Sequence, residues 1–258
     1  MTADLTPDLS PGLTRDAFLC GRLHLWQPQK GYRAATDAVL LAAACPAQAG
    51  QRVLDLGCGV GAASLCLAAR VPGLALWGLE VQDGYADLAR RNAVENGVMI
   101  EVVTGDLTEM PAALRIGFDQ VIANPPWYPR GGTASPTAAR DRALRAQLPL
   151  ADWVAAGSKR LDPGGWLTMI FGAEGLPEVL HALGTRLGSA AVLPLAARAG
   201  RPALRVILRA RKGGRAAFRL LAPLVIHDGL AHNDDRESYS ARANDILRNG
   251  APLLAEFS

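Results

Sequence analysis

The chain has 258 residues, half of them hydrophobic, and a formal net charge of +3 at pH 7. These values allow one large domain with a sizeable core, or one domain with an appendage. They exclude a strongly basic protein, and no apolar run is long enough to cross a bilayer, so no membrane partner is expected. The N-terminus shows no basic segment followed by an apolar one, which predicts no secretory signal and a cytoplasmic location.

No metal site is expected. The four cysteines form no Cys-x-x-Cys pair, which favours buried thiols in a reducing compartment. A group of His and Asp residues near the C-terminus has the spacing of no standard metal site, and we interpret it as a polar loop. Its members are His227, Asp228, His232, Asp234 and Asp235.

The segment before the main domain is predicted to be a tail followed by a small extension. Residues 1–14 are expected to be disordered, and residues 15–48 to form a hairpin and a helix. Apolar and polar side chains alternate within residues 18–33, which predicts a short strand or hairpin that closes near Gly31. A helix over residues 38–44 can be capped by Thr36 or Asp37.

From residue 52 onward, strand patterns alternate with helix patterns, which predicts an α/β domain with a mostly parallel sheet covered on both faces. Strands are expected at 52–56, 74–79, 98–104, 118–123 and 166–171, and helices at 62–70, 84–96, 147–161 and 176–187. Strands at 191–195 and 204–210 are joined by a short turn, which favours an antiparallel hairpin at the sheet's end. The domain is placed at 49–212. A C-terminal extension, 213–258, is expected to add a strand at 218–226 and a helix at 239–248.

The first strand of the domain runs into a glycine-rich turn, Gly57-Cys58-Gly59-Val60-Gly61, at the start of a helix. Glycines allow the backbone to approach a ligand closely. In a dinucleotide-binding turn the third glycine would come one residue later, and the carboxylate of Asp55 would repel a pyrophosphate. S-adenosylmethionine (SAM), which carries a sulfonium and an ammonium group and no phosphate, suits this turn better.

Polar side chains follow the next three strands at their ends. Glu80 can accept hydrogen bonds from both ribose hydroxyls, Asp106 can accept one from an adenine amino group, and Asn124 follows the fourth strand. Glu80 alone is compatible with a solvated charge and Asp106 with a helix cap. Because the carboxyl ends of parallel strands meet at one edge of a sheet, the set together predicts a ligand site there.

Asn124 opens the stretch Asn124-Pro125-Pro126-Trp127, in which two prolines end the strand. The side-chain oxygen of Asn124 and the carbonyl of Pro125 can accept hydrogen bonds from an exocyclic amino group, whose lone pair is otherwise delocalised into the base. These acceptors would orient the nitrogen and stabilise the positive charge that it gains. Trp127 offers a face for stacking.

Residues 51–210 resemble the class I SAM-dependent methyltransferases. The resemblance implies a Rossmann-like, seven-stranded sheet with the last strand antiparallel, and SAM bound at the residues quoted above. Those residues are Asp55, Gly57, Gly59, Gly61, Glu80, Asp106 and Asn124. It also implies that Thr36 and Asp37 lie by the methionine end of the cofactor.

The Asn-Pro-Pro-Trp stretch resembles the Asn-Pro-Pro-Tyr motif of enzymes that methylate adenine N6, guanine N2 or glutamine amides. Here Trp stands in the fourth place and Tyr128 follows, so either ring is a candidate for stacking on the target. With residues 23–37 and the basic C-terminal part, the chain looks like the bacterial tRNA(Val) adenine-N6 methyltransferases. The implied substrate is adenine near a tRNA anticodon. Guanine-N2 methylation of rRNA, glutamine methylation of a release factor and a non-catalytic SAM- or RNA-binding module are the alternatives.

Two basic segments are candidates for RNA contact. The irregular segment 129–145 and the strand with its following turn carry the candidate residues Arg140, Arg142, Arg145, Arg205, Arg209, Arg211, Lys212 and Arg215. Alternation along the strand predicts that its arginines share one exposed face, which suits phosphate contacts. A sheet edge protected by charge is the alternative explanation.

Overall fold

The computed structural model describes residues 12–126, 148–229 and 238–258. The chain begins with an antiparallel hairpin of β1 (Leu13–Phe18) and β2 (Leu23–Pro28). Its turn lies between these strands, at Leu19 and Cys20, which both have positive φ, and not near Gly31 as predicted. The buried Leu19 side chain anchors this turn to the core. Strand β1 also begins inside the segment that was expected to be a tail.

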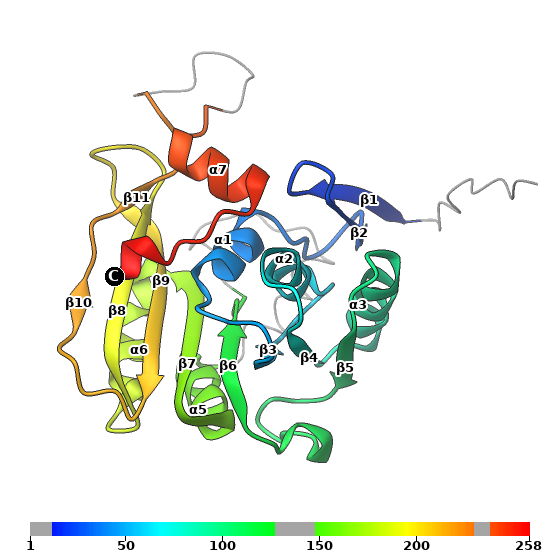
Figure 1. The fold of residues 1–258 in the computed structure, drawn as a ribbon, viewed down its shortest axis with the longest axis horizontal. Helices are drawn as coiled ribbons and strands as arrows, with labels where there is room; N and C mark the ends of the chain where they lie inside the picture. Colours follow the sequence, from blue (N-terminus) through cyan, green and yellow to red (C-terminus); the bar gives the residue numbers. More distant parts are fainter. Residues whose placement is uncertain (1–11, 127–147, 230–237) are drawn as a thin grey trace, which may run out of the picture.

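A large twisted sheet forms the centre of the molecule (Figure 1). Its seven main strands are β3 (Arg52–Leu56), β4 (Ala75–Glu80), β5 (Ile100–Thr104), β6 (Phe118–Ala123), β7 (Leu161–Gly172), β8 (Leu187–Ala196) and β9 (Ala203–Lys212). They lie in the order β8-β9-β7-β6-β3-β4-β5. The last strand, β9, is antiparallel to both its neighbours, and the other pairings are parallel, which confirms the predicted topology.

The strand expected at 218–226 is two short pieces, β10 (Arg219–Leu220) and β11 (Leu224–Val225), which pair with β8. Most other boundaries differ from expectation by a few residues, and β3, α2 and β6 agree with it at both ends.

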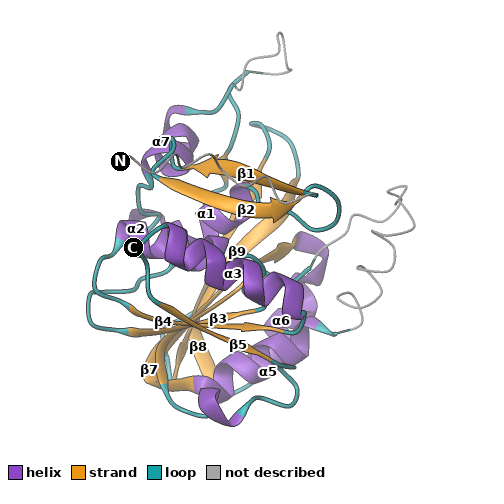
Figure 2. Cartoon of the chain, turned by 90° about the vertical axis from the view of Figure 1, so that its right-hand side faces the viewer, coloured by secondary structure: helices purple, strands orange, loops and turns teal. Residues whose placement is uncertain are grey.

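Helices cover both faces of the sheet, as predicted (Figure 2). One face carries α1 (Thr36–Ala44), α2 (Ala62–Arg70) and α3 (Asp83–Glu95), and the other carries α5 (Leu150–Arg160) and α6 (Leu176–Leu183). Helix α7 (Ala241–Asn249) packs against α1. Short 3₁₀ turns lie at Ala112–Leu114, Ala173–Gly175 and Ala255–Phe257. Neither Thr36 nor Asp37 caps α1, because the helix already begins at Thr36 and its N-cap residue is Ala35.

The sheet separates two hydrophobic cores. Val53 of β3 faces the core under α1 and α2, whereas Leu54 and Leu56 face the core that contains Trp153 of α5. All three β3 side chains are fully buried. Strands buried on both faces are typical of parallel sheets, which is why β3 reads as a nearly continuous apolar run.

Candidate active site

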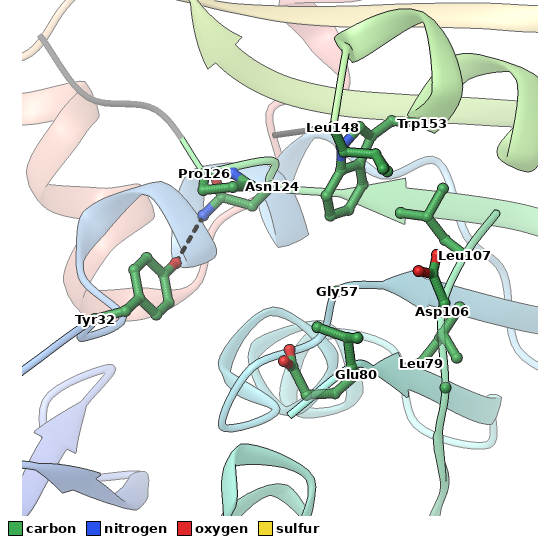
Figure 3. Close-up of a pocket in the computed structure, with 12 residues that line it drawn as sticks. Tyr32, Gly57, Leu79, Glu80, Asp106, Leu107, Asn124, Pro126, Leu148 and Trp153 are labelled. Carbon is green, nitrogen blue, oxygen red and sulfur yellow. Dashed lines mark hydrogen bonds between the residues drawn. The ribbon is translucent and has the colours of Figure 1, made fainter. Parts of the chain in front are cut away.

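A pocket lies where β3, β4, β5 and β6 end, at the carboxyl edge of the parallel strands (Figure 3). It is lined by Tyr32, Gly57, Leu79, Glu80, Val81, Gly105, Asp106, Leu107, Asn124, Pro126, Leu148 and Trp153. The pocket brings together four of the residues predicted from the ends of successive strands: Gly57, Glu80, Asp106 and Asn124. Pro125 is buried directly beside Asn124.

The glycine-rich turn follows β3 and requires glycine at the pocket wall. Gly57 has φ +66°, and a Cβ added to it would lie 2.7 Å from Cη2 of Trp153. Gly59 also has positive φ, and Gly61 lies left-handed at the start of α2, against Ala89 of α3. The turn therefore leaves room for the Trp153 ring to lie directly over Gly57.

The Glu80 carboxylate is held in place at the end of β4. The residue is only 2% exposed. Its Oε2 accepts a hydrogen bond from the backbone N–H of Gly59 at 2.9 Å, and its Oε1 accepts one from Gln82 at 3.1 Å. A carboxylate can accept about four hydrogen bonds in all. Glu80 therefore ties the glycine-rich turn to β4 and places its carboxylate at the wall of the pocket.

Asp106 lies across the pocket, after β5. Its Oδ1 accepts two hydrogen bonds from Thr108, one from the backbone N–H and one from the hydroxyl, both at 2.7 Å. Its Oδ2 receives no hydrogen bond from the described residues. Val81, which is 53% exposed, and Leu107 provide apolar surface beside these carboxylates. The arrangement suits a flat group with a polar edge.

Asn124 is oriented by a tyrosine from the N-terminal extension. Its Nδ2 donates a hydrogen bond to the hydroxyl of Tyr32 at 3.3 Å (Figure 3). The Tyr32 backbone is held in turn by Tyr85 of α3, whose hydroxyl accepts from the Tyr32 N–H and donates to the Tyr32 carbonyl, each at 3.1 Å. With its Nδ2 engaged, Asn124 keeps its Oδ1 as an acceptor.

Sequence reasoning missed Tyr32 and Trp153 as pocket residues. Tyr32 comes from the segment between β2 and α1, and Trp153 from α5, so neither stands at the end of a strand of the large sheet. Tyr32 lay within the segment that carried the family resemblance, but no local pattern gave its side chain a role. Trp153 is 7% exposed, and its Nε1 has no hydrogen-bond partner among the described residues.

Asp55 lies beneath the pocket and does not line it. It is 2% exposed, and its Oδ2 accepts a hydrogen bond of 2.8 Å from the hydroxyl of Ser64 in α2. Burial raises the pKa of Asp55 to about 7; the Ser64 hydrogen bonds oppose that shift, and the charge of Glu80 adds to it. This carboxyl therefore joins β3 to α2, behind the glycine-rich turn.

Thr36 and Asp37 lie apart from this pocket. Thr36 lines a second pocket, and the Asp37 carboxylate forms an ion pair with Arg205 of β9. Burial raises the pKa of Asp37 above its ordinary value, and the Arg205 charge opposes that shift. The contact predicted between these two residues and the cofactor stays a prediction; in the structure Asp37 contacts β9.

The arginines of β9 do not share one exposed face. Arg209 is 8% exposed, and its guanidinium lies 4.8 Å from the Trp166 ring and 4.6 Å from the Phe257 ring. Burial lowers the pKa of Arg209 to about 10. The 3₁₀ turn Ala255–Phe257 packs against β8 on this part of the sheet (Figure 1), and Ile207 of β9 is fully buried as well. Arg209 is therefore a packed core residue, contrary to the predicted exposed stripe.

The remaining basic residues lie at two ends of β9. Arg205 is level with Gly172, at the carboxyl end of β7, whereas Arg211 is level with Trp166. Arg211 lies six positions after Arg205 on the strand, which corresponds to roughly 20 Å. Arg211 donates a hydrogen bond to the Gly164 carbonyl at 3.0 Å and, with Lys212 and Arg215, lines a hollow at the far end. Trp127, Tyr128, Arg140, Arg142 and Arg145 lie outside the described residues.

Metal-binding groups and membrane-spanning helices are both absent from the residues that the structure describes. Among residues 12–126, 148–229 and 238–258, no group of three or more His, Cys, Asp or Glu side chains is arranged to hold a metal ion. His227 of the predicted polar loop stacks on Tyr239 instead, with ring centroids 5.0 Å apart. No helix in these ranges has the length and apolar character needed to span a membrane.

The family model of the methyltransferase small domain matches residues 34–182, more than half of the chain. The chain belongs to this family. It is a SAM-dependent N-methyltransferase with the class I fold. The residues present fit SAM: the Glu80 carboxylate can accept hydrogen bonds from hydroxyls, Asp106 keeps an acceptor for an amino group, and Gly57 puts no side chain into the pocket.

The chain is similar to proteins that are named as different methyltransferases. The tRNA1(Val) (adenine(37)-N6)-methyltransferase of Porphyromonas gingivalis (strain ATCC 33277) is 32% identical over 185 residues, which cover 67% of this chain and 72% of that protein. The release factor glutamine methyltransferase of Geobacter sulfurreducens is 32% identical over 145 residues, covering 53% of this chain and 50% of its own. The solved structure of a predicted O-methyltransferase from Agrobacterium tumefaciens has a TM-score of 0.67 and 28% identity, and the match covers 84% of this chain and 97% of that one.

Proposed function

We propose that this enzyme methylates the exocyclic N6 amino group of an adenine in tRNA, near the anticodon. The proposal depends mainly on the position of the Asn124 amide. Tyr32 holds this amide at one end of the pocket, and Glu80 and Asp106 lie at the other end. The name of the Porphyromonas gingivalis relative supports the choice of adenine in tRNA.

The cofactor end of the pocket is assigned to the β3, β4 and β5 side. Glu80 accepts hydrogen bonds from the ribose hydroxyls, and Asp106 accepts one from the adenine amino group. Val81 and Leu107 provide apolar surface beside the adenine ring. SAM, when bound there, supplies a methyl group made electrophilic by the sulfonium.

The acceptor end of the pocket is assigned to Asn124 and Pro125. The Asn124 Oδ1 and the Pro125 carbonyl accept the two hydrogens of the target amino group, which directs the nitrogen lone pair toward the methyl group. As the N–C bond forms, the bond between the methyl group and the sulfonium sulfur breaks and its electron pair stays on a neutral thioether. The nitrogen gains positive charge, and the same two acceptors stabilise it. The amino proton then passes to water, so no strong base is required. Alignment of the two reacting atoms provides most of the rate.

The stacking partner of the target base is assigned to Trp127 or Tyr128, which both follow the acceptor pair. A base within a loop swings out of its stack to reach such a pocket, and an aromatic face offsets part of the cost of unstacking. Separate Trp127→Ala and Tyr128→Ala variants decide between the two rings. The variant that lacks the stacking ring has the higher KM for RNA.

The test is methyl transfer from labelled SAM to bulk tRNA, bulk rRNA and a release factor, each taken from cells that lack this enzyme. Nucleoside mass spectrometry of the RNA should show N6-methyladenosine in tRNA. Label in guanine of rRNA, or no label in any RNA, contradicts the proposal.

Glutamine methylation of a release factor is the second candidate. It is favoured by the Geobacter sulfurreducens relative and by the chemistry of Asn124, since a glutamine amide is also a planar NH2. The same experiment separates the two, because label would then appear in protein and not in tRNA.

A further inference from the structure

A second pocket lies next to the active site. Most of its lining residues lie outside the range that matches the family model. It is lined by Thr36, Leu40, Leu195, Ala197, Leu204, Arg205, Ile226, His227 and Tyr239. Seven of these nine residues follow residue 182, where the family match ends. They belong to β8, the turn between β8 and β9, β9 itself and the C-terminal extension. Most of this pocket therefore lies outside the part of the chain that matches the family model.

Strand register places this pocket close to Asn124. Ala123 of β6 is level with Met169 of β7, and Gly172 of β7 is level with Arg205 of β9. Arg205 thus lies two strands across from Asn124 and two residues further along. With about 4.8 Å between strands and about 3.3 Å per residue, their Cα atoms are roughly 12 Å apart. The segment that leads into α1 also connects the two pockets. Tyr32 lines the active site, and Thr36, four residues later, lines the second pocket.

The lining combines flat apolar surface with a positive charge. The rings of His227 and Tyr239 are stacked, with 18° between their planes. Leu204 projects at the rim and is 65% exposed. Arg205 provides a guanidinium group, which forms an ion pair with Asp37 of α1. Aromatic and apolar faces beside an arginine are the surface that proteins use for an unpaired base and its phosphate.

We infer that this pocket holds the nucleotide that adjoins the methylated one in the RNA chain. The inference rests on the proposed function, because it requires an RNA substrate. The neighbouring base packs against Leu204 and the His227–Tyr239 pair, and its phosphate lies by Arg205. The C-terminal extension then acts as part of the substrate site: it completes a pocket that a lone target base would not fill.

Leu204→Glu tests the inference, because it places a carboxylate at the pocket rim where a phosphate and a base are to bind. Its matched control is Leu220→Glu on β10, since Leu220 is 66% exposed and lines none of the pockets described here. The substrate is bulk tRNA that lacks the modification. For Leu204→Glu we expect the KM for tRNA to rise about tenfold, with kcat within a factor of two. The control should match the parent in both constants.

A binding measurement that needs no turnover supplies the second readout. Fluorescence anisotropy of a labelled single-stranded RNA, in the presence of S-adenosylhomocysteine, should show weaker binding for Tyr239→Leu and parental binding for Tyr239→Phe, which keeps the ring. Thermal melting of both variants shows whether the extension remains folded.

The failures of the two proposals are distinguishable. If the parent methylates tRNA and Leu204→Glu has the parental KM, the subsite is wrong and the proposed function stands. A fall in kcat at unchanged KM also contradicts the subsite. If the parent methylates a release factor and no RNA, the proposed function is wrong. The nucleotide subsite is then wrong as well, because it requires an RNA substrate.

Discussion

The Asn124 amide and the Tyr32 hydroxyl are joined by a 3.3 Å hydrogen bond across 92 residues of sequence. The bond links the N-terminal extension to the stretch that carries the proposed acceptor. Tyr85 forms two hydrogen bonds with the Tyr32 backbone, and these hold the Tyr32 hydroxyl in position beside Asn124. The amide is thereby oriented before a substrate arrives.

Removing the hydroxyl tests that orientation. For Tyr32→Phe we expect kcat to fall about fivefold to tenfold, since one hydrogen bond contributes about 1 kcal/mol. The affinity for SAM, measured by calorimetry, should stay within a factor of two. Parental kcat in this variant would show that Asn124 is oriented without Tyr32.

Removing the acceptor itself should have a larger effect. For Asn124→Ala we expect kcat to fall by about 100-fold or more, the scale seen when one group that stabilises charge in a transition state is lost. SAM binding should persist, because Glu80 and Asp106 are untouched. Transfer of labelled methyl groups at the parental rate would falsify the proposed mechanism.

Gly57→Ala should destabilise the protein by more than backbone strain alone, because the added Cβ meets Trp153 at 2.7 Å. Gly97→Ala is the matched control: its φ is +63°, against +66° at Gly57, and nothing lies within 4 Å of its added Cβ. Strain at such a position costs about 1 kcal/mol. Urea unfolding should show a loss for Gly57→Ala that exceeds the control by about 1–3 kcal/mol, and equal losses would show that Trp153 moves aside freely.

The buried Asp55 carboxyl should make stability fall as pH rises. Its pKa is about 7 in the folded protein, against 3.8 ordinarily, so between these values the folded state binds the proton more strongly than the unfolded state. The stabilisation is complete below pH 3.8 and is lost as pH rises through about 7. The Asp55→Asn variant keeps an acceptor for the Ser64 hydroxyl but has no carboxyl that titrates. Between pH 3.8 and about 7, its urea midpoint should therefore fall less than that of the parent. An unchanged pH profile would show that Asp55 is not the titrating group.

Arg209 should matter to stability and not to RNA. Arg209→Ala removes packing against Trp166 and Phe257 and should lower the free energy of unfolding by about 2 kcal/mol. Arg215→Ala, on the exposed turn, should leave stability unchanged. At a temperature where both variants are folded, Arg209→Ala should have the parental KM for tRNA. A raised KM would place Arg209 at the RNA surface after all.

Local rules were sufficient to predict the main sheet and the strand-end residues that line the pocket. Strand and helix periods are local, and β3, α2 and β6 were predicted to the residue. Glu80, Asp106 and Asn124 were found because parallel strands point their carboxyl ends to one edge. That rule depends only on which residues follow each strand.

Contacts between distant segments decided the rest. Tyr32 and Trp153 enter the pocket from elements whose placement depends on packing across the whole domain. Alternation along β9 identified which side chains share a face, but it carries no information about what covers that face. Phe257, nearly fifty residues later in the chain, buries Arg209, and Asp37 of α1 reaches Arg205. Periodicity describes one element at a time, whereas burial and pairing depend on which element lies opposite.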